Sequence, residues 1–218
     1  MVERSKAASR SAPATREQIL RAASRLFQEK GYFGASTRDI AKAVGIRQQS
    51  LSHHFGSKRA IIDALLAAGL EEPLAFAQEM ARQDGSPAVR LYRYVRFDTA
   101  YLCRSPYELS GLFDDGLLRH PGFRAWRRRV SGLPQATGRV IREGIDLGEF
   151  VDIDVDFAAA TIDGLVERAM RLWPARARHA AGRTLPDLVA SFALRALLVD
   201  PSALPGVRRG ADLAGAAR

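Results

Sequence analysis

The chain has 218 residues, of which 47% are hydrophobic and 26% are charged, proportions that are ordinary for a globular protein of one or two domains. A single cysteine, Cys103, excludes an internal disulfide framework and a cysteine-based zinc site. Because no apolar run approaches the roughly 20 residues that cross a bilayer, and the first residues lack the apolar stretch of a secretory signal, we expect a cytoplasmic protein without a membrane segment.

The net charge of +9 is concentrated near the N-terminus. Residues 1–58 hold 11 Lys and Arg against 4 Asp and Glu, whereas the remaining residues are nearly balanced. A local basic excess is expected of a protein that binds a polyanion such as DNA, but a basic surface that only keeps the protein in solution has the same charge. The pattern of helices has to decide between these interpretations.

The first 14 residues are rich in Ser, Ala, Lys and Arg without any period, which predicts a disordered basic arm. Such an arm either follows the DNA backbone or minor groove or, more simply, is a solvated tail. A helix is predicted from Thr15, which forms a capping-box pattern with Gln18, to Gly31, which suits a left-handed C-terminus. Its apolar positions recur at helical spacing: Ile19, Ala22, Ala23, Leu26 and Phe27.

Two short helices are predicted next, the first from Ser36 or Thr37 to Gly45 and the second over about residues 48–54. Ser36 is a favourable N-cap residue, and Leu51 gives the second helix an inward anchor. Two short helices joined by a tight glycine turn form a helix-turn-helix, which places its second helix in the major groove of DNA. Periodicity alone fits a helical hairpin of any all-α protein equally well.

The polar side chains that this packing leaves outward are types that bond base edges or phosphates. They are Arg47, Gln48, Gln49, Ser50, Ser52 and His53.

Longer helices are predicted near 58–82, 87–104, 107–119, 122–147, 155–173 and 185–199, with Pro134 kinking or splitting one of them. Because alternating apolar and polar residues are nearly absent, the predicted fold class is all-α. We expect a helix-turn-helix DNA-binding domain over 15–58, a helical regulatory and dimerisation domain over 59–200, and a flexible Gly/Ala-rich tail over 201–218.

Several motifs resemble the N-terminal signature of the tetracycline-repressor (TetR) family of bacterial regulators, over about residues 15–62. They are Phe27-x-x-x-Gly31-Tyr32, Ser36-Thr37-x-Asp39-Ile40-Ala41, Ala43-Val44-Gly45-Ile46 and Leu51-x-x-His54-Phe55-x-Ser57-Lys58. A weaker likeness to the later part of that family lies in Ile141-Arg-Glu-Gly144 and Gly148-Glu149-Phe150.

The resemblance implies a DNA-binding transcriptional regulator, expected as a homodimeric repressor that a small-molecule ligand releases from a near-palindromic operator in double-stranded DNA. An activator or a ligand-independent regulator is the alternative within this class. An all-α enzyme would leave the first 58 residues unexplained, and neither a nucleotide-binding glycine loop nor a nucleophile-elbow motif occurs. We therefore expect no enzyme and no cofactor.

The resemblance also implies roles for single residues. Ser36, Thr37 and Lys58 would contact phosphate, and the exposed face of the recognition helix would carry Gln48, Gln49, Ser52 and His53. Two positions depart from the family's usual pattern: Ser52 stands where tyrosine is frequent, and Arg47 stands where serine is frequent. Arg47 offers instead a phosphate or guanine contact.

The helices over 155–173 and 185–199 carry more apolar surface than one helix face needs within a single chain, which favours a four-helix interface between two chains over ordinary core packing within one. The predicted dimer residues are Phe157, Thr161, Gly164, Leu165, Arg168, Leu188 and Phe192.

The middle helices are rich in aromatic residues, which suit the wall of a small-molecule pocket but are more often core. The candidates are Phe97, Tyr101, Phe113 and Trp126. No metal site is predicted: the neighbours His53 and His54 point about 100° apart on a helix, and the alternating Asp152, Asp154 and Asp156 indicate a solvated lead-in to a helix.

Overall fold

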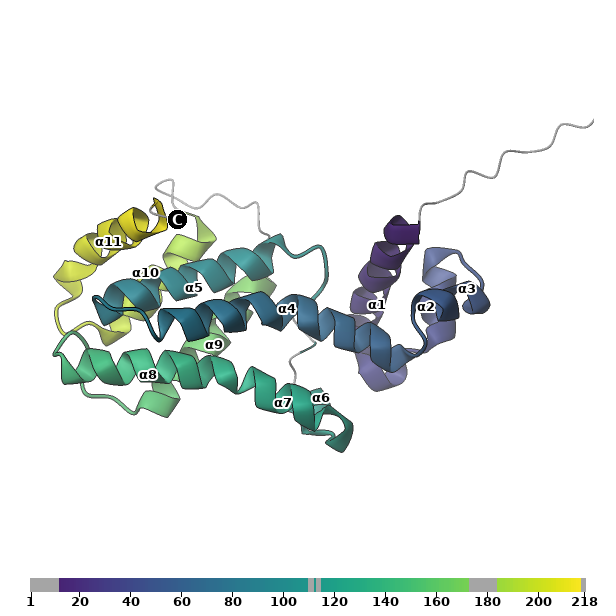
Figure 1. Cartoon of the computed structure of the whole chain (residues 1–218), viewed down its shortest axis with the longest axis horizontal. Coiled ribbons are helices and arrows are strands. Elements are labelled where there is room, and N and C mark those ends of the chain that lie inside the picture. The colour runs from purple at the N-terminus through teal and green to yellow at the C-terminus, as the bar shows by residue number, and fades with distance from the viewer. Residues whose placement is uncertain (1–11, 110–111, 113–114, 173–183, 217–218) are drawn as a thin grey trace, which may run out of the picture. The chain divides into compact units, whose positions relative to one another are not determined.

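The computed structural model describes residues 12–109, 112, 115–172 and 184–216 (Figure 1). These residues form helices, with one isolated antiparallel bridge between Phe150 and Leu198, so the predicted all-α class is confirmed. They divide into two compact units, which we describe separately. The first holds residues 12–67, 106–109 and 112, and the second holds the remaining described residues.

The first unit is built from three helices and the start of a fourth: α1 (Ala12–Gly34), α2 (Thr37–Val44), α3 (Gln48–His54) and α4 (Lys58–Met80). Helix α1 begins three residues earlier than the predicted Thr15, and the rest of the predicted basic arm lies outside the described residues. Gly31 interrupts α1 with a φ of 70°, the left-handed conformation expected of a glycine there. The buried side chains of this unit include Ile19, Ala23, Phe27, Ile40, Leu51 and Phe55.

The boundary between the two units falls inside α4, after Ala67, rather than at the predicted residues 58–59. Ile61, Ile62 and Leu65 on this part of α4 are buried, which explains why its first turns belong to a core. The chain returns to the first unit at residues 106–109, where the amide of Glu108 donates to Ser24 Oγ at 3.1 Å. The predicted helix over 107–119 is therefore reduced to α6 (Asp115–Arg119).

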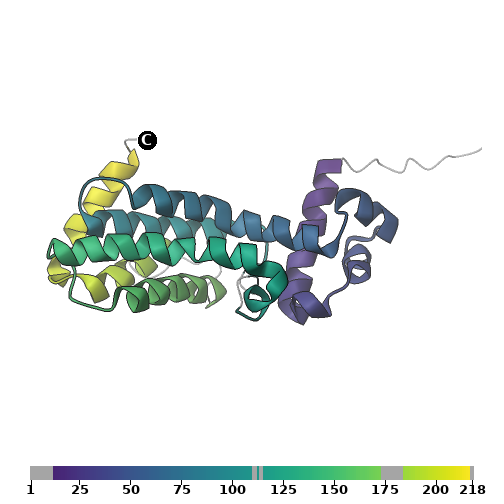
Figure 2. The ribbon, with the colours of Figure 1, turned by 60° about the horizontal axis from the view of Figure 1, so that its bottom comes forward.

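The second unit surrounds helix α5 (Pro87–Arg104), which packs against the part of α4 after Ala67 and against four further helices (Figures 1 and 2). The four are α8 (Gly132–Asp146), α9 (Val155–Leu172), α10 (Leu185–Leu197) and α11 (Leu204–Ala216). The peripheral elements are α6, the short 3-10 turns η1 (Pro121–Phe123) and η3 (Pro201–Ala203), and α7 (Arg124–Val130).

The predicted helix over 122–147 is split, as expected near Pro134. The break lies at Ser131, so that Pro134 occupies the first turn of α8, where a missing N–H costs nothing.

The end of the chain differs from the predicted flexible tail, because residues 204–216 form α11. Leu204, Val207 and Ala211 are buried at helical spacing, and the Arg96 guanidinium pairs with Asp212 at 2.5 Å. The high Gly and Ala content concealed this amphipathic pattern in the sequence.

The Gly148-Glu149-Phe150 motif closes the turn after α8. The Glu149 carboxylate accepts hydrogen bonds from Ser86 Oγ at 2.8 Å and from the amide of Ala88 at 2.9 Å, where a negative charge suits the N-terminus of α5. The Phe150 ring lies against Gly144, where an added Cβ would come within 2.1 Å of the ring. Only glycine at position 144 allows this ring to be buried.

We expect Gly144→Ala to lower the thermal unfolding temperature, with a loss of about 1–3 kcal/mol typical of overpacking a core. The control is Gly206→Ala in α11, where a Cβ would meet only Arg209 at an ordinary 3.9 Å. Differential scanning calorimetry should show a lower unfolding temperature for the first variant only. Equal unfolding temperatures would contradict the packing described for Phe150.

Candidate functional site

Helix α2 is fixed at both ends by its sequence. Ser36 Oγ accepts from the amide of Asp39 at 3.1 Å, and the Asp39 carboxylate accepts from the amide of Ser36 at 3.0 Å, which completes a capping box. Hydrogen bonds from Ser36 also lower the pKa of Asp39. At the other end, Gly45 adopts a φ of 73°, which turns the chain toward α3.

Helix α3 has only seven residues and is held from behind. Leu51 and Phe55 are 1% and 3% exposed, so both anchors are buried in the first unit. The Arg16 guanidinium lies 4.1 Å from the centre of the Phe55 ring and donates to the backbone oxygen of His54 at 3.1 Å. This cation at the C-terminus of α3 ties the helix to α1.

The role of Arg16 was not predictable from the sequence, because its partner His54 lies 38 residues away and leaves no local signal.

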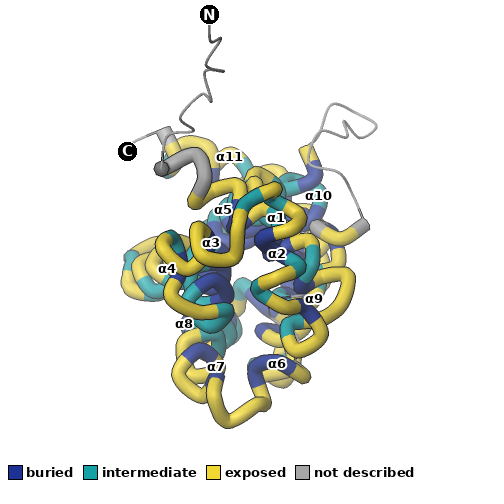
Figure 3. The backbone as a smooth tube through the Cα atoms, turned by 90° about the vertical axis from the view of Figure 1, so that its right-hand side faces the viewer, coloured by how far each residue is buried: buried dark blue, intermediate teal, exposed yellow. Residues whose placement is uncertain are grey.

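The opposite face of α3 is exposed (Figure 3). It presents the polar side chains that the sequence assigned to it: Arg47, Gln48, Gln49, Ser50, Ser52 and His53.

Two side chains of this face make internal hydrogen bonds. Gln48 Nε2 donates to Thr37 Oγ1 at 3.3 Å, which brings the start of α2 beside the start of α3. Ser52 Oγ donates to the backbone oxygen of Gln48 at 3.1 Å, so its hydroxyl remains an acceptor. Arg47 is the N-cap of α3 but makes no side-chain capping bond.

Lys58 has a role that the sequence did not predict. Its Nζ donates to the backbone oxygens of Tyr32 and Ala35, both at 2.8 Å, and lies 4.4 Å from the centre of the Tyr32 ring. Partial burial lowers the pKa of this amine. An ammonium has three N–H donors, and these two bonds use two of them.

An exposed helix with hydrogen-bonding side chains, beside the capped N-terminus of α2, has the chemistry needed to contact both base edges and phosphates.

In the second unit, the structure brings two of the predicted ligand residues together. Phe97 stacks on Phe76 with ring centres 4.3 Å apart and on Tyr101 at 6.0 Å, and the Tyr101 hydroxyl donates to the backbone oxygen of Ala68 at 2.8 Å. Trp126 is buried on α7, with the Arg129 guanidinium 4.8 Å from its ring centre. Phe113 lies outside the described residues.

The predicted dimer residues lie along α9 and α10, two helices that pack on each other. Phe157 and Phe192 are 63% and 66% exposed, whereas Ile162 and Val166 on the inner side of α9 are buried. Of the other predicted residues, the exposed ones are Thr161, Gly164 and Arg168. The half-buried ones are Leu165 and Leu188. A single chain therefore leaves two large aromatic side chains uncovered.

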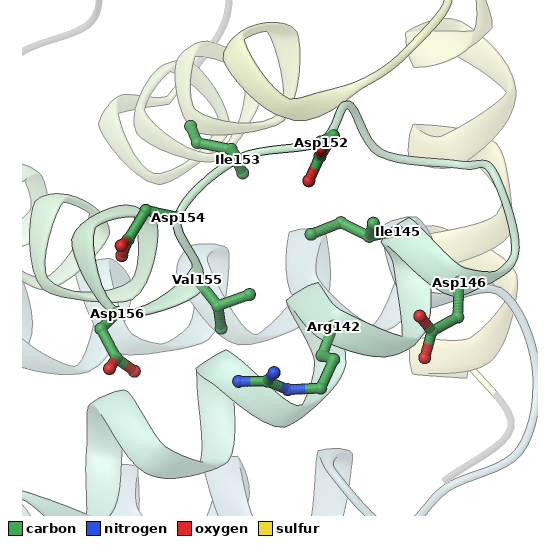
Figure 4. A pocket seen from close by; sticks show the side chains of 8 residues that line it. All are labelled: Arg142, Ile145, Asp146, Asp152, Ile153, Asp154, Val155 and Asp156. Atoms are coloured by element: carbon green, nitrogen blue, oxygen red, sulfur yellow. The ribbon is translucent and has the colours of Figure 1, made fainter.

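A shallow hollow beside the turn between α8 and α9 is lined by Arg142 and four aspartates (Figure 4). Asp154 accepts from the amide of Phe157 at 2.8 Å, so it caps α9 in the manner of a helix lead-in. No group of three potential metal-binding side chains occurs among the described residues. None of the described helices is long and apolar enough to span a bilayer.

Comparison with known proteins agrees with this geometry. Residues 19–65 match the family model of bacterial regulatory proteins of the tetR family. The crystal structure of AmtR from Mycobacterium smegmatis is similar over 99% of this chain and 98% of that chain, with 32% sequence identity and a TM-score of 0.73. This chain belongs to the TetR family. It is a DNA-binding transcriptional regulator.

Two further relatives are similar to this TetR-family protein. The transcriptional repressor KstR2 of Mycobacterium tuberculosis is 36% identical over 76 residues, which are 35% of this chain and 38% of KstR2. The chain thus matches little more than a third of that relative's length. The structure of AibR in complex with isovaleryl coenzyme A and operator DNA has the same fold, with 19% identity, a TM-score of 0.65, and coverage of 86% of this chain and 98% of AibR.

We expect Lys58→Met to lower the unfolding temperature, because two partly buried carbonyl oxygens lose their charged donor, at a cost of about 1–3 kcal/mol. The control is Lys42→Met, an exposed lysine in the last turn of α2. Unfolding should be followed by circular dichroism without DNA. If both variants unfold at the wild-type temperature, the inward bonds of Lys58 do not stabilise the fold.

Proposed function

We propose that this regulator is a homodimeric repressor that binds a near-palindromic operator in double-stranded DNA and leaves it when a small molecule binds the second unit. The observation that carries the proposal is the exposed polar face of α3, which Leu51, Phe55 and Arg16 hold in place from behind. Such a protein acts in the cytoplasm, where its DNA lies, and catalyses no reaction.

In this proposal the DNA contacts divide into two classes. Ser36, Thr37 and Lys58 contact phosphate, Lys58 through its remaining N–H donor, and so contribute affinity without sequence preference. The side chains that contact base edges are Arg47, Gln48, Gln49, Ser52 and His53.

Dimerisation follows from the small size of the DNA-contacting face. One helix meets too few bases for selective binding, and two such helices of a symmetric dimer meet successive major grooves about 34–36 Å apart. The exposed Phe157 and Phe192 of α9 and α10 supply an apolar surface for a self-complementary interface. We place in it also Thr161, Gly164, Leu165, Arg168 and Leu188.

Release by a ligand is supported by the aromatic stack of the second unit and by relatives. KstR2 is named a repressor, and AibR has been solved with both a small molecule and operator DNA. We propose that Phe97, Tyr101 and Trp126 line the ligand site; the remaining candidate, Phe113, lies outside the described residues. A ligand can weaken DNA binding only if it binds more tightly to a conformation in which the recognition helices no longer match the grooves.

The DNA-binding proposal predicts tight, saturable gel-shift binding to DNA that flanks the gene, with log affinity falling steeply against log salt concentration. Gln49→Ala and His53→Ala should change the preferred bases, because each lost base contact alters discrimination by about 1–3 kcal/mol. Lys58→Met should weaken binding to all sequences and reduce the salt slope by about one.

Affinity no higher than for random DNA would contradict the proposal. If the salt slope of Lys58→Met is unchanged, Lys58 does not contact phosphate and serves only through its bonds within the protein. DNA binding that a ligand strengthens, or that no ligand alters, would favour an activator or a ligand-independent regulator.

The dimer proposal predicts a mass of twice 23.9 kDa by light scattering. Phe192→Asp should yield a 23.9 kDa monomer, because dimerisation would then bury an unpaired carboxylate in the apolar interface, and the loss of its hydration is costly. The control is Leu213→Asp, a 74% exposed residue on α11 outside the proposed surface, which should remain dimeric. A dimeric Phe192→Asp variant would place the interface elsewhere.

A further inference from the structure

Two carboxyl groups of the second unit, those of Asp98 and Asp163, make none of the contacts described above. Asp98 on α5 is 5% exposed, and Asp163 on α9 is half-buried. The two carboxyl groups interact electrostatically, and their helices pack against each other and against α8. Asp163 points away from the exposed side of α9 that carries Phe157, since it lies on the same side as the buried Val166.

Two arginines of α5 are paired with other carboxylates. Arg90 pairs with Glu143 of α8 and donates to the backbone oxygen of Gln83 at 2.5 Å. Arg96 meets Asp187 of α10 at 3.8 Å and Asp212 of α11 at 2.5 Å.

The hydrogen bond that the structure gives Asp98 comes from the hydroxyl of Tyr94, one turn away on α5, at 3.4 Å. Neither Arg90 nor Arg96 therefore compensates the pair.

The buried hydroxyl of Thr137 on α8 lies near the Tyr94 hydroxyl. Thr137 is fully buried beside the Tyr94 hydroxyl, yet its Oγ1 has no partner at hydrogen-bond geometry among the described residues. Buried hydroxyl groups are usually bonded, so an unpartnered one marks a place where a ligand or water supplies the missing bond.

Burial also changes the acidity of the pair. Loss of hydration raises the pKa of Asp98 to about 7, and burial together with the charge of Asp98 raises the pKa of Asp163 to about 7. The pair therefore holds protons near neutral pH that ordinary aspartates have lost. A cation placed between the carboxyl groups would favour their ionised form and displace those protons.

We propose that Asp98, Asp163, Tyr94 and Thr137 form a recognition site for the ammonium group of a small organic cation. The carboxylates supply opposite charge, and the hydroxyls complete the hydrogen bonds of the ammonium. The proposal that this cation is the effector rests on the function proposed above. The proposal that the protein binds the cation does not depend on that function.

The surroundings favour an organic cation with an apolar part. Tyr101 lies three residues after Asp98 on α5, at the spacing that places side chains together on a helix, and its ring centre is 6.0 Å from that of Phe97. Their stack with Phe76 offers aromatic faces, which attract both ammonium groups and apolar chains.

The test is calorimetric titration of the full-length protein, without DNA, at pH 6 and pH 8. The probes are methylammonium, n-butylammonium and 2-phenylethylammonium, and the neutral controls are methanol, n-butanol and 2-phenylethanol. We expect at least one ammonium to bind, with a Kd at least tenfold lower at pH 8 than at pH 6, because protons compete with it at the lower pH. The matching alcohol should not bind.

The variants are Asp98→Asn and Asp163→Asn, each of which should raise the Kd at pH 8 at least tenfold. Asp156→Asn, an exposed aspartate of α9, is the control and should bind like the wild type. Asp98→Asn should fold, since it removes an unpaired buried charge, and should unfold at a higher temperature than the wild type at pH 8.

Equal binding of an ammonium and its alcohol, wild-type affinity in both site variants, or no binding of any probe would overturn the site. Ammonium binding that leaves DNA affinity unchanged would support the site but remove the effector role, so failure of the site and failure of the proposed function are distinguishable.

Discussion

The fixed position of α3 is the constraint on which DNA recognition depends. A helix of seven residues is only marginally stable alone, so tertiary contacts must hold it. Leu51 and Phe55 are buried behind it, and Arg16 bonds its C-terminal carbonyl while covering the Phe55 ring. These contacts occupy one face and leave the polar face exposed, which prepares that face for a groove at little further cost in conformational entropy.

In the second unit, the central helix α5 is well packed but carries buried polar groups. Helix α5 packs against α4 and four further helices, yet it carries the buried Asp98 and Tyr94 among apolar neighbours. A core built for stability alone would place apolar groups there, because an unpaired buried carboxylate is costly. The polar groups are explained if part of the unit's stability is supplied by a ligand, which also gives the ligand a means of shifting a conformational equilibrium.

The sequence predicted α2, α3 and α5 nearly to the residue, because caps such as Ser36 and Gly45 and the proline at the start of α5 are local signals. It also predicted which α3 side chains are exposed, since helical periodicity decides that. It failed where the deciding contact is distant: the bonds of Arg16, the inward turn of Lys58, and the packing of residues 106–109 on the first unit. Helix α11 was missed because small residues obscure its apolar face.

In the proposed dimer, two copies of the α3 face contact DNA together. Hydroxyl-radical footprinting of both strands, on a fragment that the protein binds tightly, reveals where each copy lies. We expect two protected segments related by symmetry and centred about one helical turn, roughly 10 base pairs, apart. A single protected segment, or the same two segments with a variant in which Gln48, Gln49 and His53 are all alanine, would contradict this arrangement.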